Sequence, residues 1–211
     1  AGKRVVVIGS GATAVTLVPE LAKQAAHVTM LQRSPTYIVA RPSEDALANT
    51  MRRWLPGKLA YSLTRWKRVL LSIYIFQLCR RDPAKIKRMI AGGVRMALGP
   101  DYDVAKHFTP RYNPWDQRLC LAPDGDFFAA IKSGCASVAT DEIERFTETG
   151  IQLKSGAHLA ADVIVTATHG VLSGPAVDRL KNSRVSEVVV TNTLPIAQDQ
   201  RFDRLTVYLR R

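Results

Sequence analysis

The sequence predicts an α/β fold, a doubly wound domain built on a parallel sheet, and three observations support this. Near the start, residues 5–8 are all apolar, glycines follow, and residues 15–22 have the length of a helix. A strand that is apolar at every position is typical of a parallel sheet covered on both faces. Residues 27–31 and 162–167 are two further strand-like segments. The composition, 46% hydrophobic and 23% charged, is that of a globular protein.

The turn after the first strand has the spacing G-x-G-x-x-A, formed by Gly9, Gly11 and Ala14. The first glycine permits the tight turn, and the second has no Cβ to keep a diphosphate off the backbone. A small third residue lets helix and strand pack closely. The N–H groups at the helix start would bind the anion. Because the motif lies between a strand and a helix, it predicts a dinucleotide site. A glycine turn without a ligand is the alternative.

The second strand, residues 27–31, is followed by Arg33 and Ser34 and by no acidic residue. In a dinucleotide fold an acid at this position accepts hydrogen bonds from the 2′-hydroxyl of NAD, whereas an arginine suits the 2′-phosphate of NADP. A guanidinium makes charge-assisted, often bidentate contacts with phosphate. We therefore expect NADPH as the ligand, with a merely solvated Arg33 as the alternative.

Residues 42–100 depart from this pattern and carry most of the net charge of +12. Residues 51–95 contain twelve lysines and arginines against one acid, Asp82. Apolar spacing predicts an amphipathic helix over 55–73, and Pro83 begins a second basic helix that runs to about Leu98. Three interpretations stay open: a helical insert packed on its own domain, a surface that docks the remainder of a larger protein, or a basic helix on an anionic membrane or nucleic acid.

The remaining segments complete the expected domain. Residues 107–120 are rich in proline and aromatic residues and read as a loop. In order after it we expect a short strand at 119–121, a helix capped by Asp124 and ending at Lys132, a hairpin of 142–146 and 151–153, and a buried strand at 162–167.

No metal or disulfide site is expected. The three cysteines, Cys79, Cys120 and Cys135, form no C-x-x-C pair, and the histidines have no metal-ligand spacing. Reduced thiols, and no recognisable signal or spanning segment, lead us to expect a cytoplasmic protein, peripheral to a membrane if the basic segment binds lipid. Because the sequence opens on a core strand without methionine, we expect a piece of a longer protein.

Four segments resemble, in order, the NADPH-binding half of flavin-dependent monooxygenases of the Baeyer–Villiger and flavin-containing type. They are GKRVVVIGSGATA, VTMLQRSPTYI, FTPRYNPWDQRLC-x-x-PDGDFF and LAADVIVTAT, and they cover about residues 2–168. The similarity is greatest to the bacterial branch that oxygenates ketones and thiocarbonyl compounds. In that family NADPH reduces FAD, and the flavin carries the oxygenation chemistry.

The resemblance implies where the cofactor binds. It assigns the pyrophosphate to the glycine turn and the 2′-phosphate to Arg33; the candidate cofactor-binding residues are Gly9, Ser10, Gly11, Ala12, Thr13, Ala14, Arg33 and Ser34. It assigns no catalytic residue to this chain. The family binds FAD through a separate N-terminal glycine motif, and none precedes Ala1. We therefore expect that FAD is not retained and that the chain alone is inactive.

From Thr168 onward the chain resembles a second family, the C-terminal part of ribose-phosphate pyrophosphokinase. The matching segments are THGVLSGPAVDRLKNS, EVVVTNTLP and RFDRLTV, without the catalytic residues of the kinase. Gly174 and Pro175 begin a helix to about Lys181, and residues 187–191 and 205–209 read as strands. We expect them to extend the parallel sheet by a right-handed crossover.

The expected organisation is a Rossmann-like NADPH-binding domain of residues 1–41 and 101–168, a helical insert of residues 42–100, and a foreign C-terminal βαβ segment of residues 169–211. The expected function is NADPH binding inherited from a flavin monooxygenase. The alternatives are a non-catalytic interaction module whose basic insert binds an acidic surface, or a chimeric or designed chain without function. Phosphoribosyl transfer has only the tail in its favour.

Overall fold

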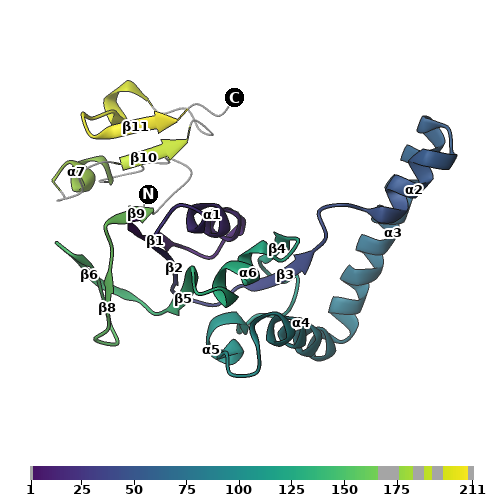
Figure 1. Cartoon of the computed structure of the whole chain (residues 1–211), viewed down its shortest axis with the longest axis horizontal. Coiled ribbons are helices and arrows are strands. Elements are labelled where there is room, and N and C mark those ends of the chain that lie inside the picture. Colours follow the sequence, from purple (N-terminus) through teal and green to yellow (C-terminus); the bar gives the residue numbers. More distant parts are fainter. Residues whose placement is uncertain (1, 166–175, 183–187, 192–196, 209–211) are drawn as a thin grey trace.

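The computed structural model describes residues 2–165, 176–182, 188–191 and 197–208. Its centre is a four-stranded parallel sheet in the order β5-β2-β1-β9 (Figure 1). The strands are β1 (Arg4–Ile8), β2 (His27–Gln32), β5 (Ala136–Thr140) and β9 (Val163–Val165). The chain steps outward from β1 through β2 to β5 and then returns to the other side of β1. The strand order therefore reverses beside β1, and in open α/β sheets ligands bind at the carboxyl ends of the strands at such a reversal.

Helices cover one face of this sheet. α1 (Ala12–Ala22), α5 (Val104–Phe108) and α6 (Asp126–Lys132) lie on it, and the core between them holds Val15, Val18, Met30, Phe108 and Phe127. Successive β1 side chains alternate between the faces. Val5 and Val7 therefore join this core, whereas Val6 points to the opposite side.

The opposite face is covered by strands rather than helices. β6 (Ile143–Thr147), β7 (Gly150–Leu153) and β8 (His158–Ala160) form a three-stranded antiparallel sheet. Its Ile151 and Leu153 pack with Val6 and Leu31 of the central sheet. The predicted hairpin is confirmed, and β8 adds a strand that the sequence did not reveal. The connection from β5 to β9 is thus an antiparallel meander rather than the crossover helix that a doubly wound fold uses.

Three helices follow one another along the chain between two paired strands. β3 (Tyr37–Arg41) and β4 (Leu119–Pro123) form a parallel two-stranded sheet. Between them come α2 (Ala46–Trp54), α3 (Gly57–Arg81) and α4 (Pro83–Leu98). The helices predicted over 55–73 and from Pro83 to Leu98 are confirmed as α3 and α4, with α3 longer than expected.

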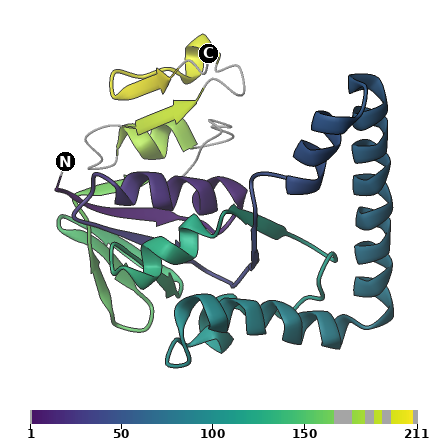
Figure 2. The same ribbon diagram turned by 45° about the vertical axis from the view of Figure 1, so that its right-hand side comes forward.

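α2 and α3 project from the rest of the molecule, and α4 lies along it (Figure 2). α4 buries Ile86 and Val94, but α3 buries only Ala60 and Cys79. An insert packed on its own domain therefore describes α4 and not the middle of α3. None of the helices in the described ranges is long and apolar enough to cross a bilayer.

Two local expectations are wrong. The N-cap of α6 is Gly125, which has a φ of 71°, and not Asp124. The Asp124 carboxylate instead accepts a hydrogen bond from the Ser43 N–H at 2.8 Å. β9 is also not buried as expected: within the described part of the chain it is an edge strand, and Val163 is 37% exposed.

The tail contains the expected elements in a different arrangement. α7 (Ala176–Lys181), β10 (Val188–Thr191) and β11 (Leu205–Tyr208) match the predicted helix and strands, with a 3₁₀ turn at Gln198–Gln200. β10 and β11 pair in parallel with each other and, among the described residues, form a sheet of their own. The expectation that they extend the central sheet is therefore wrong. The predicted helix start, Gly174 and Pro175, lies outside the described residues.

Candidate functional site

The turn between β1 and α1 forms an open anion cradle. Gly9 has a φ of 121°, a conformation that favours glycine, and its N–H donates to the Leu31 carbonyl at 2.8 Å. Gly11 is the N-cap of α1 and offers no side-chain cap. A Cβ built on either glycine meets no protein atom within 4 Å. The backbone is thus accessible, and the first N–H groups of α1 can bind an anion.

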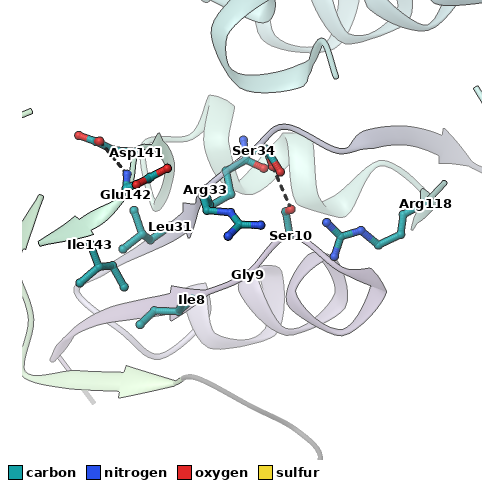
Figure 3. A pocket seen from close by; sticks show the side chains of 11 residues that line it. Ile8, Gly9, Ser10, Leu31, Arg33, Ser34, Arg118, Asp141, Glu142 and Ile143 are labelled. Atoms are coloured by element: carbon teal, nitrogen blue, oxygen red, sulfur yellow. Dashed lines mark hydrogen bonds between the residues drawn. The ribbon is translucent and has the colours of Figure 1, made fainter. Parts of the chain in front are cut away.

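A cavity of about 390 Å³ lies beside this turn, at the carboxyl ends of β1, β2 and β5 (Figure 3). Its lining residues are Ile8, Gly9, Ser10, Leu31, Gln32, Arg33, Ser34, Arg118, Asp141, Glu142 and Ile143. The cavity therefore lies where the reversal of strand order beside β1 predicts a ligand site. Four of the candidate residues therefore line one cavity: Gly9, Ser10, Arg33 and Ser34.

The candidate residues contribute in different ways. The Ser10 hydroxyl lies 2.7 Å from the Thr36 hydroxyl oxygen and 3.5 Å from the Ser34 carbonyl oxygen, so it is engaged inside the protein. Ser10 and Ser34 can consequently offer backbone groups, and Ser34 also its exposed side chain. Arg33 is exposed and extends into the cavity from the end of β2 (Figure 3).

The helix start supplies the remaining candidates. Ala12 and Thr13 are exposed at the first turn of α1, where their N–H groups adjoin the cradle. Ala14 is 7% exposed and packs into the helical core beside Val15. Ala14 therefore acts through the close packing of helix on strand, as the motif requires, rather than through an exposed side chain.

Three charged residues of the cavity were not foreseen. Arg118 comes from the loop before β4, and Asp141 and Glu142 directly follow β5. Although no acidic residue follows β2 directly, the cavity therefore contains two acidic residues from the end of β5. The available signal was the short alternating segment 136–140, whose recognition as a strand would have placed the two acids beside Arg33.

Both acids have partners. The Asp141 carboxylate accepts from the N–H groups of Glu142 and Ser155 at 2.7 and 3.3 Å, and Glu142 forms an ion pair with Lys154 at 2.5 Å. The Ser155 side chain contributes most to lowering the pKa of Asp141, and the N–H groups of Glu142 and Ser155 add to the effect. The bond from Lys154 does the same for the pKa of Glu142. Both carboxyl groups are therefore ionised at neutral pH.

A buried polar cluster fixes the end of β2 beneath the cavity. Gln32, 2% exposed, donates from Nε2 to the His107 carbonyl at 2.7 Å and to the Thr140 hydroxyl at 2.9 Å. Burial lowers the pKa of His107, which favours a neutral ring. The cluster joins β2, β5 and α5. Within the described ranges no group of three or more histidines, cysteines or acids could hold a metal ion.

Comparison with curated proteins reveals close relatives. FAD-containing monooxygenase EthA of Mycobacterium tuberculosis is 56% identical over 167 residues, which are 79% of this chain and 34% of that protein. The chain's homologues are FAD-containing monooxygenases. Probable FAD-binding monooxygenase AlmA of Acinetobacter baylyi is 50% identical over 202 residues, covering 90% of this chain and 40% of that protein. The chain thus spans about a third of the length of the first of these relatives and two fifths of the second.

Solved structures share the fold. A steroid monooxygenase bound to NADP matches with a TM-score of 0.57 and 21% identity, over 79% of this chain and 39% of that one. The complex of OTEMO with FAD and NADP matches with a TM-score of 0.56 and 20% identity, over 80% and 38%. At these identities the likeness concerns the fold alone.

The resemblance of the C-terminal segment to a second family is also found. Residues 136–206 match the family of the phosphoribosyl synthetase-associated domain. Residues 1–168 make up about 80% of the chain, yet the match to AlmA covers 90% of it. The match to AlmA therefore extends past residue 168. The two likenesses overlap along the sequence.

Proposed function

We propose that this chain is the NADPH-binding part of a flavin-dependent monooxygenase. The parent reaction is the NADPH- and O₂-dependent oxygenation of ketones or sulfur compounds. In this proposal residues 1–41 and 101–168 form the NADPH-binding domain, residues 42–100 the helical insert, and residues 169–211 a C-terminal segment. The observation that carries it is the open glycine turn with Arg33 extending into the adjoining cavity.

The residues of the cradle fit a dinucleotide phosphate. The N–H groups at the start of α1, in Ala12 to Ala14, would hold the pyrophosphate, because they have no side-chain cap and adjoin accessible backbone. The Arg33 guanidinium would bind the 2′-phosphate. NADPH, when bound, supplies a hydride for the reduction of a flavin. The chain's own contribution is to bind and orient the dinucleotide.

FAD is expected to be bound elsewhere. A second diphosphate needs its own strand–turn–helix cradle. The β1–α1 turn, with its adjoining cavity, is the cradle that this proposal assigns to NADPH. We propose that this chain alone retains no FAD and shows no NADPH oxidase activity. Stoichiometric flavin absorbance in the purified protein would contradict this.

The cofactor proposal is tested by titration with NADPH and NADH, followed by nicotinamide fluorescence. Arg33→Ala should weaken NADPH binding about tenfold or more, because one contact to a charged group contributes about 1.5–3 kcal/mol. NADH binding should change little. Arg52→Ala on α2, an exposed arginine outside the cavity, is the control. Equal affinity of the unaltered protein for both dinucleotides would overturn the assignment of Arg33.

We also propose that the projecting helices bind anionic surfaces weakly. Residues 69–77 of α3 are uncharged and exposed, and Trp54 and Trp66 are 80% and 64% exposed. Basic residues flank this segment, and residues 46–81 contain no acid. Exposed aromatic and basic residues suit the surface of an anionic bilayer. Co-sedimentation with phosphatidylserine vesicles should occur at low salt and fall steeply as salt rises. Binding that is unchanged by salt would refute the charge-driven mode.

A further inference from the structure

The turn between β7 and β8 contacts Asp141 and Glu142, the two acidic residues that line the wall of the cavity. Lys154 donates from Nζ to the Glu142 carboxylate at 2.5 Å and from its backbone N–H to the Glu142 carbonyl at 2.9 Å. The Ser155 N–H donates to the Asp141 carboxylate at 3.3 Å. One ion pair and two hydrogen bonds donated by backbone N–H groups therefore hold this turn against the two residues that follow β5.

Glu142 shares the cavity with the arginine proposed to bind phosphate. Glu142 and Arg33 both line it, at the ends of the neighbouring strands β5 and β2 (Figure 3). Lys154 is the main cause of the lowered pKa of Glu142, and the positive charge of Arg33 also contributes. The carboxylate thus lies in the field of two cations, one of which belongs to the outer turn and the other to the cavity.

We propose that Lys154 is a specificity-determining residue that holds Glu142 at the wall and leaves the Arg33 guanidinium for the 2′-phosphate of the cofactor. This inference rests on the NADPH binding proposed above. Lys154 lies outside the set of residues that line the cavity. It acts through Glu142 and is a positioning residue in this respect.

The consequence of losing Lys154 differs between the two dinucleotides. Without it, Glu142 pairs with Arg33 and also repels a doubly charged phosphate at the same place. NADH has no 2′-phosphate and is spared, and a carboxylate near the ribose can accept a hydrogen bond from its 2′-hydroxyl. Repulsion between exposed charges several ångströms apart in water corresponds to a change in affinity of about threefold to tenfold.

The fold should not depend on this ion pair. The Lys154 and Glu142 side chains are 62% and 50% exposed. Exposed pairs of this kind contribute little to stability. A change in cofactor preference on substitution therefore reports on the cavity rather than on unfolding, and thermal melting of each variant checks this.

The experiment measures NADPH and NADH affinities for Lys154→Ala, Glu142→Gln and the double variant of the full chain. Lys154→Ala should weaken NADPH binding by about threefold to tenfold and leave NADH binding unchanged or stronger. Glu142→Gln in the Lys154→Ala background should restore the preference for NADPH, and Lys154→Arg should keep it. Lys23→Ala is the matched control, because Lys23 forms an equally exposed ion pair with Glu20 on α1, outside the cavity.

The outcomes separate this inference from the proposed function. If the unaltered chain does not prefer NADPH, or Arg33→Ala has no effect, the proposed function fails. If both of those hold but Lys154→Ala keeps the preference, the role of Lys154 is refuted. A loss of NADPH binding in Lys154→Ala that Glu142→Gln does not reverse would also refute it, because the effect would then not pass through Glu142.

Discussion

Alanine substitutions at the two glycines of the cradle should change different properties. Gly9→Ala should lower the stability of the fold, whereas Gly11→Ala should weaken NADPH binding. Gly11 has a φ of −78°, which any residue adopts, and a Cβ there meets no protein atom within 4 Å. Gly11→Ala should therefore change the free energy of unfolding by no more than about 1 kcal/mol, because the lower chain entropy of the unfolded state and the poorer N-cap partly offset each other. Gly9 has a φ of 121°. Gly9→Ala should destabilise the fold by about 1–2 kcal/mol through backbone strain.

NADPH binding, in contrast, should be sensitive to the substitution at Gly11. A methyl group on Gly11 occupies the space through which a pyrophosphate reaches the N–H groups of α1. The loss of one such charge-assisted hydrogen bond, about 1.5–3 kcal/mol, weakens NADPH binding about tenfold or more. Urea unfolding without ligand gives the stabilities, and fluorescence titration gives the affinities. The reasoning is refuted if Gly11→Ala binds NADPH normally, or if it destabilises the ligand-free protein as much as Gly9→Ala does.

Two further predictions concern groups outside the cavity. The hydrogen bond from Arg4 lowers the pKa of Asp162 from 3.8 to about 2. This lowering stabilises the folded state above pH 3.8 and is lost as the pH falls towards 2, so Asp162→Asn should flatten the dependence of stability on pH in that window, as measured by urea unfolding at a series of pH values. Cys135 is exposed, whereas Cys79 and Cys120 are 2% and 4% exposed with pKa values raised by burial. One thiol should therefore react rapidly with Ellman's reagent in the native protein, and Cys135→Ser should abolish that fast phase.

Local signals predicted the elements that local chemistry determines. β1 and α1 follow from an apolar run, a glycine turn and a helical segment. α4 begins at Pro83 and ends at Leu98, as expected, because Asp82 caps its first turn through the Lys85 N–H and proline fits the first helical position. These features depend on neighbours in the sequence and need no tertiary contact.

Features that depend on distant partners escaped prediction. β5 is a short segment of small and hydroxyl-bearing residues, and its strand character comes from parallel pairing with β2. β10 and β11 were correctly recognised as strands, but apolar β-branched residues do not specify a pairing partner. They pair with each other rather than with the central sheet.

The candidate site shows the same division between local and distant information. Arg33 could be proposed as a cofactor-binding residue because it follows a recognisable strand that itself follows a glycine turn. Glu142 and Lys154 could not, since the place of Glu142 in the cavity depends on β5 pairing with β2, and its contact with Lys154 depends on the β7–β8 turn folding back over the end of β5. Specificity is a difference between two affinities, and it often requires a repulsive element as well as an attractive one. Arg33 would attract the 2′-phosphate, and Lys154 would keep the Glu142 carboxylate from pairing with Arg33. Together these effects would provide that difference in affinity. The attractive half could be inferred from the sequence around one strand, whereas the acid and its lysine come together only in the folded sheet.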